Sequence, residues 1–443
     1  MAVITVVTSI LMNIKTLESL FSVAGRLSGT FQYSNTYSIL CLICIIVLFT
    51  DENIKILNIL TSLILIFGIF YSGSRTVFVL MGLTFLVLFF KIKSKKIKLT
   101  LIISVFVAVG GFIIYDFLIN DFYMMSRLLK ISFGESTFVG RILYWYDALP
   151  QIIKRPFGMG YMGYYFAQNS FKSGVYSVMF AHNDFLQIVL DVGFIPFILL
   201  CVAIVKTLFS KKVSFTRKLA LIVFSLHIFF DFDLQFVAMF IIFILLLDWD
   251  NGKVYTTSHI EGFIFSIVVV TLVNIYFFFA LFFQYIGKNE LSLSLYDFNT
   301  FARVEQIKET TNLKKLEKIA DATIKQNKYV SIAYSAKAKY AYSSGDFANV
   351  INYKKQAVET NYYDIAEYED MFEMLMVGAS MYKQSGDTYS YDYCEKELKK
   401  IPDYVDDALE KQSTLGKKIK DQPELEFSDE IKVYMVELGI DEN

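Results

Sequence analysis

Charged side chains, prolines, histidines and cysteines are all scarce in this chain of 443 residues. Charged residues make up 19% of it, against 55% hydrophobic and 17% aromatic residues, and there are five prolines, three histidines and four cysteines. A soluble domain of this length carries more charge, so the composition predicts a membrane protein. The charge is sparse up to about residue 290 and dense after it, which indicates a membrane part followed by a soluble part. The net charge of −1 by itself says nothing about partners. No nucleic-acid partner is expected.

The few histidines and cysteines also argue against a metal centre. The sequence has no H-E-x-x-H motif, no zinc-ligand spacing and no G-x-x-x-x-G-K-[ST] phosphate loop. Cys41 and Cys44 form a C-x-x-C within an apolar run, where two small helix residues are a simpler interpretation than a redox pair. Gly158–Gly163 spells G-x-G-x-x-G, but Lys154-Arg155-Pro156 precedes it in place of a buried strand. We therefore expect a tight turn there and no dinucleotide site, and no cofactor or metal.

Apolar stretches dominate the first two thirds of the chain. A spanning helix needs roughly 20 mostly apolar residues, and fewer where its ends reach the interface. The candidate spans are Thr36–Thr50, Ile54–Tyr71, Thr76–Ile92, Leu99–Ile119, Asp184–Leu208, Lys218–Phe230, Asp233–Trp249 and Ile260–Ile286. The expected fold class is all-α: a polytopic membrane helix bundle of about eight or nine spans with a large outer loop, followed by a soluble helical-repeat domain.

Lysines and arginines in short loops predict the side of the membrane on which each loop lies. One basic loop covers residues 91–98 and another covers 206–218, and both are expected in the cytoplasm. Two spans lie between them, so the insert at residues 120–183 is expected to face outward, and loop 248–259 to face inward. The expected domains are an N-terminal segment at 1–35, the membrane domain at 36–286, a helical domain at 287–412 and a charged tail at 413–443. The helical domain then also lies outside.

A repeated turn follows the last candidate span. Ser344-Gly345-Asp346 returns as Ser385-Gly386-Asp387, each between segments of helical periodicity. Glycine is the residue expected where two paired helices turn. The pattern predicts either two degenerate tetratricopeptide units, which stack and present a concave surface to envelope proteins, or a generic helical bundle.

Several ionisable residues stand beside the apolar stretches. Arg75 either anchors its span at the interface or serves a site, because arginine is expensive within a bilayer. Arg141 lies on one face of an amphipathic segment and either contacts headgroups or binds a phosphate with its planar guanidinium. His182 precedes a span, where a neutral imidazole can take a proton. His227 and Asp231 are one helical turn apart, as either a structural pair or part of a site.

These residues occur in an order that resembles the O-antigen ligase and polymerase family of bacterial membrane glycosyltransferases. The matching pieces are Arg26-Leu27-Ser28-Gly29-Thr30-Phe31 with Asn35, Ser74-Arg75-Thr76, Gly140-Arg141 with Trp145, Pro156, Gly158 and Gly160, His182-Asn183-Asp184-Phe185-Leu186 with Gly193, and His227 with Asp231-Phe232-Asp233. Members of the family carry further spans before the first of these pieces. The resemblance thus implies a sequence shortened at its N-terminus. The helical part after the last span resembles an extension found in some Gram-positive members.

The resemblance implies a reaction and a role for each residue. A glycan on undecaprenyl pyrophosphate is the donor, a hydroxyl of an acceptor glycan attacks its anomeric carbon, and no metal takes part. His182 is then the base, and Arg75 and Arg141 stabilise the leaving pyrophosphate. The residues expected to line the substrate site are Arg26, Asn35, Trp145, Asn183, His227, Asp231 and Asp233. The protein is expected in the bacterial cytoplasmic membrane, in contact with its lipids.

Four functions remain open at this point. The protein polymerises repeat units of a surface polysaccharide, or it ligates finished glycan to a wall or protein acceptor. A transporter of the same lipid-linked sugar is a third reading, but transporters gather polar groups near the membrane midplane. A scaffold that docks envelope proteins through its repeats is the fourth.

Overall fold

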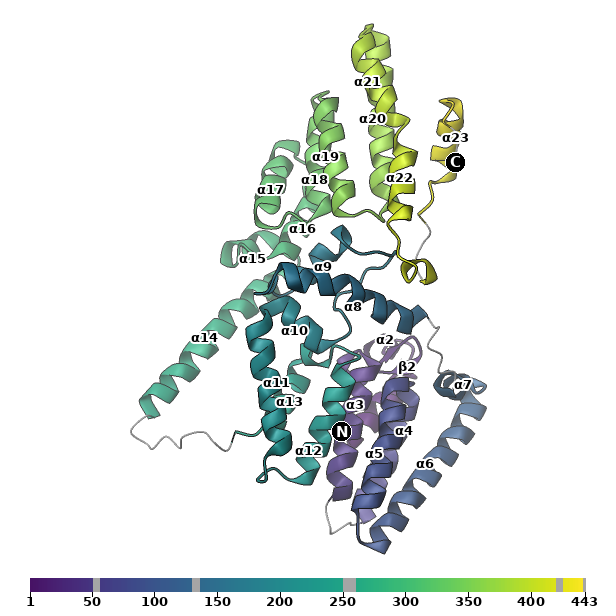
Figure 1. The fold of residues 1–443 in the computed structure, drawn as a ribbon, viewed down its shortest axis with the longest axis vertical. Helices are drawn as coiled ribbons and strands as arrows, with labels where there is room; N and C mark the ends of the chain where they lie inside the picture. The colour runs from purple at the N-terminus through teal and green to yellow at the C-terminus, as the bar shows by residue number, and fades with distance from the viewer. Residues whose placement is uncertain (51–55, 130–135, 250–259, 420–424, 441–443) are drawn as a thin grey trace. The chain divides into compact units, whose positions relative to one another are not determined.

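The computed structural model describes residues 1–50, 56–129, 136–249, 260–419 and 425–440, and it is almost wholly helical over them (Figure 1). The regular β-structure within these ranges is a hairpin of β1 (Ser22–Val23) and β2 (Arg26–Leu27), paired antiparallel. The predicted all-α class is therefore confirmed for the described part of the chain. Packing divides the chain into a first unit, Met1–Tyr161 with Phe180–Gly252, and a second unit, Met162–Met179 with Lys253–Asn443.

The first unit contains most of the apolar helices. Its helices are α1 (Ala2–Leu11), α2 (Glu18–Phe21), η1 (Gly29–Phe31), α3 (Ser34–Thr50), α4 (Ile56–Ser72), α5 (Arg75–Lys91), α6 (Lys95–Asn120), α7 (Tyr123–Leu129), α8 (Ser136–Lys154), α10 (Asp184–Val192), α11 (Phe194–Phe209), α12 (Phe215–Ile228), η3 (Asp233–Gln235) and α13 (Val237–Leu246). Helix α3 packs against α4, α5 and α12, and α4 packs against α1 and α6. The core of this unit is apolar and is centred on α3 and α4.

The helices coincide with the candidate spans to within a few residues, with two differences. The span predicted at Asp184–Leu208 is broken at Gly193 into α10 and α11. Gly193 has a φ of +85°, which a right-handed helix cannot contain, so α10 ends there. Glycine adopts this φ without the strain that a side chain would cause. The span predicted at Asp233–Trp249 begins with the short turn η3, and its helix covers only Val237–Leu246. Residue Ile54, where another span was expected to begin, lies outside the described residues.

Within the described residues, two helices are long and apolar enough to cross a membrane, over Lys95–Leu118 in α6 and Ile264–Tyr285 in α14. Only 6% of the second stretch is buried within the protein, and its exposed side chains are mainly isoleucine, valine, leucine and phenylalanine. Such a surface suits lipid better than water. Shorter apolar helices include α3, α4 and α11. The number of spans and the side of each loop stay predictions, and most of the predicted inner loop 248–259 lies outside the described residues.

The glycines of the G-x-G-x-x-G motif make the turn that the sequence predicts. The amides of Met159 and Gly160 donate to the carbonyls of Leu190 and Asp191, at 2.6 and 3.0 Å, so the turn covers the end of α10. Gly158 has a φ of +86°, and a Cβ on it would lie 2.5 Å from the carbonyl oxygen of Asp191. The backbone therefore approaches α10 more closely than any other residue would allow.

In the second unit, the apolar helix α14 (Ile260–Tyr285) is followed by a series of polar helices. These are α15 (Asn289–Leu295), α16 (Thr300–Glu309), α17 (Leu313–Gln326), α18 (Ser331–Ser343), α19 (Phe347–Thr360), α20 (Ile365–Ser385), α21 (Thr388–Leu398), α22 (Ile401–Glu410), η5 (Gly416–Lys418) and α23 (Asp429–Glu437). The two repeated turns have the same geometry. Gly345 and Gly386 have φ values of +73° and +77°, and Asp346 and Asp387 cap the helices that follow. The helix pairs are thus present, and their identity as tetratricopeptide units stays a prediction.

Residues 162–179 of the insert pack with the helices of this second unit. They form α9 (Gly163–Ala167), η2 (Gln168–Ser170) and an irregular segment. The hydroxyl of Tyr362 donates to the carbonyl of Ser170 at 2.6 Å, and the amide of Ser413 donates to the carbonyl of Ser173 at 2.9 Å. The ring of Phe301 stacks on Tyr165. The insert expected at 120–183 is therefore divided between the two units.

Substituting alanine at Gly158 and at Gly160 separates backbone strain from a steric clash. Gly160 has a φ of +82° and nothing within 4 Å of an added Cβ, so Gly160→Ala is expected to destabilise the protein by about 1–2 kcal/mol through strain alone. Gly158→Ala adds the clash with the carbonyl of Asp191 and should lower the apparent melting temperature of the purified protein clearly further. Equal melting temperatures for the two variants would contradict the close approach to α10.

Candidate functional site

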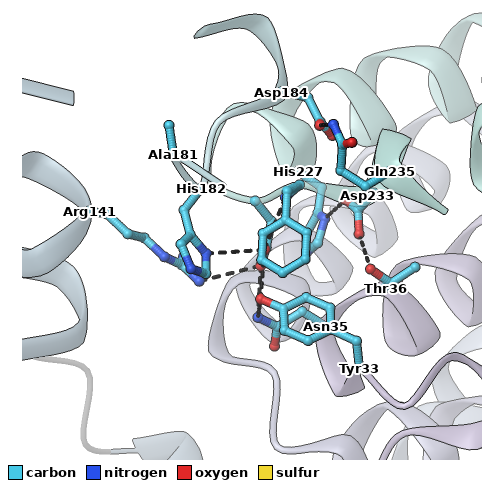
Figure 2. A network of polar contacts seen from close by, with 12 residues as sticks. Tyr33, Asn35, Thr36, Arg141, Ala181, His182, Asp184, His227, Asp233 and Gln235 are labelled. Atoms are coloured by element: carbon cyan, nitrogen blue, oxygen red, sulfur yellow. Dashed lines mark hydrogen bonds and ion pairs between the residues drawn. The ribbon is translucent and has the colours of Figure 1, made fainter. Parts of the chain in front are cut away.

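The candidate site is built around one buried carboxylate, that of Asp231, which lies between α12 and η3. Figure 2 shows the polar network around it, with Tyr33, Arg141 and His182 labelled. Oδ1 of Asp231 accepts a hydrogen bond from the hydroxyl of Tyr33 at 2.7 Å. Its Oδ2 accepts from Nδ2 of Asn35 at 2.7 Å and from Nη2 of Arg141 at 3.3 Å. Nδ1 of His182 lies 3.5 Å from Oδ1. The start of α3, the helix α8 and the residues before α10 therefore converge on one side chain.

The backbone around Asp231 holds the carboxylate in place. Helix α12 ends at Ile228, and the chain then turns. Oδ1 of Asp231 accepts the amide of Phe232 at 3.1 Å. The carbonyl of Asp231 accepts the amide of Asp184, the first residue of α10, at 3.1 Å. Oδ2 of Asp184 in turn accepts the amide of Leu234 at 2.8 Å. The link after α12 is thus fastened to the segment that carries His182.

The predicted pairing of His227 with Asp231 is wrong. Nδ1 of His227 pairs with Oδ2 of Asp233, and both side chains are fully buried. Oδ1 of Asp233 accepts the hydroxyl of Thr36 at 2.5 Å. Because α12 ends before Asp231, the one-turn spacing does not apply, and the chain brings Asp233 back to the helix instead. His227 and Asp233 therefore join α12 to α3 and lie beside the site.

His182 has a strained backbone and an open ring. Its φ is +50°, a left-handed conformation that is uncommon for residues other than glycine. The edge of its ring meets the face of Phe232, with centroids 4.8 Å apart. Nδ1 faces Asp231, while Nε2 makes no hydrogen bond with any residue that the structure describes, and 22% of the side chain is exposed. The arrangement presents Nε2 to a substrate while Asp231 faces the other nitrogen.

Trp145 and Asn183 position the backbone on both sides of His182. Nε1 of Trp145 donates to the carbonyl of Ala181 at 2.9 Å. Oδ1 of Asn183 accepts the amide of Leu186 at 3.0 Å and caps α10, as an asparagine at this position is expected to do. Both residues were predicted to bind substrate, and in the structure their polar atoms hold the His182 segment.

The charges around Asp231 keep its carboxyl ionised. Burial by itself would raise the pKa of Asp231, but the guanidinium of Arg141 and the ring of His182 outweigh burial and hold this pKa well below its usual range. Burial beside the same carboxylate raises the pKa of Tyr33, so its hydroxyl stays protonated and donates. The cluster therefore contains a permanent negative charge that faces one fixed cation and one histidine.

A second basic group surrounds the turn from α4 to α5. Nε of Arg26 donates to the carbonyl of Ser72 at 2.7 Å, and Nε of Arg127 faces the carbonyl of Gly73 at 3.4 Å. Nε of Arg75 donates to the carbonyl of Arg127 at 3.0 Å. Burial and the neighbouring charge of Arg127 lower the pKa of Arg26 to about 10. We call Arg26, Arg75 and Arg127 the arginine cluster, whose like charges favour an anionic ligand.

One asparagine links the arginine cluster to Asp231. Oδ1 of Asn35 accepts from Nη2 of Arg26 at 2.9 Å, while Nδ2 of the same amide donates to Asp231. Arg26 and Arg75 were predicted from the sequence, whereas Arg127 was not, because it belongs to no matching piece. Its signal was an arginine on a short helix, α7, just after the candidate span in α6. Gly73 lets it approach, because a Cβ there would lie 3.3 Å from Nε of Arg127.

Among the described residues, no three histidine, cysteine, aspartate or glutamate side chains are grouped so that they could hold a metal ion. The polar groups of the site are therefore two guanidinium sets, an imidazole, a phenol and carboxylates. This set can bind an anion and can move a proton at Nε2 of His182.

Residues 60–201, about a third of the chain, match the family model of the O-antigen ligases. The match includes Arg75, Arg127, Arg141 and His182, and it ends before Asp231. It supports a glycosyltransferase of the O-antigen ligase type embedded in a membrane. No curated protein and no solved structure matches the chain.

The lowered pKa of Asp231 predicts how its contribution to stability depends on pH. The stabilisation by its ionised form is fully present above the unfolded-state pKa, roughly 4, and is lost as the pH falls through the folded-state value. Asp231→Asn should therefore destabilise the protein by about 3 kcal/mol, as expected for breaking a buried pair. Above about pH 5 the carboxyl stays ionised and the wild type should melt at a higher temperature than the variant, and this difference should shrink below roughly pH 4. Asp121→Asn, at an exposed position, is the control, and a difference that grows below roughly pH 4 would contradict the assignment.

Proposed function

We propose that this protein transfers a glycan from an undecaprenyl-pyrophosphate carrier to a hydroxyl of an acceptor glycan, and thereby polymerises the repeat units of a bacterial surface polysaccharide. The observation that carries the proposal is the pairing of His182 and Arg141 with the buried carboxylate of Asp231, next to the arginine cluster. The family match over residues 60–201 supports the reaction type. The polymerising role, the carrier and the metal independence are part of the proposal.

His182 acts as the general base. The acceptor hydroxyl gives its proton to Nε2 as its oxygen forms the new bond to the anomeric carbon of the donor. Asp231, facing Nδ1 at 3.5 Å, orients the imidazole and stabilises the imidazolium that forms, because an ionised carboxylate favours the charged ring. The proton on His182 is later released to water.

The arginines stabilise the leaving group. When the bond between the anomeric carbon and the pyrophosphate oxygen breaks, the electron pair stays on the lipid pyrophosphate. Arg26, Arg75 and Arg127 lie together on the turn from α4 to α5, where guanidinium groups can bind phosphate oxygens. The guanidinium of Arg141 uses Nη2 for Asp231 and has further donors of its own. Fixed cations that face a developing charge lower the barrier without reorganisation.

The proposal includes the location of the protein. We place it in the bacterial cytoplasmic membrane with several spans, with the insert and the helical second unit on the outer side, where lipid-linked glycans are joined. The lysine-rich loops at 91–98 and 206–218 support this orientation. The exposed apolar surfaces of α6 and α14 support contact with lipid.

Deleting the gene tests the polymerising role directly. Lipid-linked single repeat units should accumulate, because they are the unused substrate. Accumulation of full-length lipid-linked polymer would instead identify a ligase, and normal glycan in every fraction would refute both. His182→Ala should reproduce the deletion, with a loss of rate of about 10²–10⁴-fold. Lys154→Ala, an exposed cation on the same helix as Arg141, should retain activity.

Arg127 allows a second test of the proposed function, because its place in the arginine cluster is seen only in the structure. Arg127→Ala should lower kcat by about 10²–10³-fold if its guanidinium stabilises the leaving pyrophosphate. Arg127→Lys should recover part of this loss, since it keeps the charge but not the planar donors. The rate of glycan transfer is measured with lipid-linked donor and with purified protein reconstituted in lipid membranes. A variant with normal folding and wild-type kcat would exclude Arg127 from the site.

A further inference from the structure

The second unit contains a polar pocket that the proposed reaction does not use. It has a volume of about 270 Å³, close to the lower end of the range of roughly 300–1,000 Å³ typical of small-molecule sites. One wall is residues 169–177 of the insert, and the other is the turn between α19 and α20. The lining residues are Asn169, Lys172, Val175, Tyr176, Ser177, Asn361, Tyr363, Asp364, Ile365 and Leu425.

Lys172 is the central cation of this pocket, and only 6% of its surface is exposed. Its Nζ donates to Oδ1 of Asn169 at 2.8 Å and to the carbonyl of Tyr176 at 2.7 Å. The same Nζ lies 5.9 Å from the ring centroid of Tyr176 and 5.8 Å from that of Tyr363. An ammonium has three donors, so the two hydrogen bonds fix its position and leave one N–H.

The cost of burying Lys172 supports a binding role. Burial lowers the pKa of Lys172 to about 8, although the carboxylate of Asp364 acts in the opposite direction. A buried ammonium with one N–H that makes no hydrogen bond is stabilised by a ligand that accepts one. Asp364 and Asn361 are joined to each other at 3.1 Å on the other wall, so acceptors and donors face the same space.

The insert is also attached to the helices of the second unit outside this pocket. The insert is fastened at other points, by Tyr362 to the carbonyl of Ser170, by Ser413 to Ser173, and by the ring of Phe301. The pocket lies between these attachments and gathers one lysine, one aspartate, two amides, a hydroxyl and two tyrosine rings. Its charges balance, so it favours no anion over a neutral ligand.

We propose that this pocket binds one uncharged sugar residue of the acceptor glycan and holds the growing chain on the second unit. The proposal rests on the proposed function for the identity of the glycan. Sugar hydroxyls both donate and accept hydrogen bonds, which matches Asp364, Lys172 and the amides. The chain runs from Tyr176 to His182 in six residues, so the pocket wall is continuous in sequence with the proposed base.

The test blocks the pocket at its rim without removing a packed side chain. Ser177 is exposed and lines the opening, so Ser177→Phe should fill it. Asp364→Asn removes the charged acceptor at nearly constant shape. Ser343→Phe is the matched control, because it adds the same ring at another exposed serine of the second unit. The probe is size-fractionated fragments of the source bacterium's own surface polysaccharide, titrated calorimetrically against the full chain in lipid nanodiscs.

Wild type and Ser343→Phe should bind the fragments, Ser177→Phe should bind at least tenfold more weakly, and Asp364→Asn should be intermediate. Cells with Ser177→Phe should make shorter polymer, whereas cells with His182→Ala make none. If the fragments bind Ser177→Phe as tightly as the wild type, or do not bind the wild type, the proposed glycan-binding role of the pocket is wrong. If binding depends on Ser177 but deletion of the gene leaves the polymer length unchanged, the pocket binds glycan and the proposed polymerising function is wrong.

Discussion

A buried negative charge is tolerated only where other groups compensate for its lost hydration, and Asp231 imposes this requirement on the whole first unit. The groups that compensate come from distant parts of the sequence: Tyr33 and Asn35 at the start of α3, Arg141 on α8 and His182 before α10. Each must be delivered within hydrogen-bonding or ion-pairing distance. The helices that deliver them are fixed by this need as much as by their apolar packing. The same charge gives the histidine its orientation, so one interaction serves both stability and the proposed chemistry.

The site has two basic parts with different partners. Arg141 is neutralised by Asp231, whereas Arg26 and Arg127 contact carbonyl groups at the end of α4. Carbonyls fix the direction of a guanidinium without cancelling its charge. These two contacts therefore leave the charges of Arg26 and Arg127 in place, while the pair of Arg141 and Asp231 is close to neutral. The amide of Asn35 spans the two parts, which couples the position of Arg26 to that of Asp231.

Much of this arrangement follows from sequence patterns, because apolar runs define helices whatever surrounds them. Helices form over most of the predicted apolar stretches, and the two turns at Gly345 and Gly386 appear where they were predicted, as does the turn at Gly158. The predictions that were wrong depended on tertiary geometry. The pairing of His227 assumed a helix that continues to Asp231, and the end of α12 brought Asp233 to it instead. The span after Asp184 was predicted to be continuous because Gly193 looks like one small residue among apolar ones.

Arg127 belongs to no motif, and only its approach to Gly73 places it beside Arg26 and Arg75. The attachment of residues 162–179 to the second unit could not be read from composition, since it depends on a few specific contacts with Phe301, Tyr362 and Ser413.

That last attachment has a consequence for how the two units are joined. The chain passes from the first unit to the second at residue 162, returns at residue 180, and passes again at residue 253. The second unit is therefore discontinuous in sequence and is not a module appended to the end of the first. Removing everything after the last apolar helix would leave Tyr165, Phe166 and Ser173 without the surface on which they pack. Recombination at one junction after that helix would exchange the partners of residues 162–179 but not those residues themselves, so the two segments would have to change together.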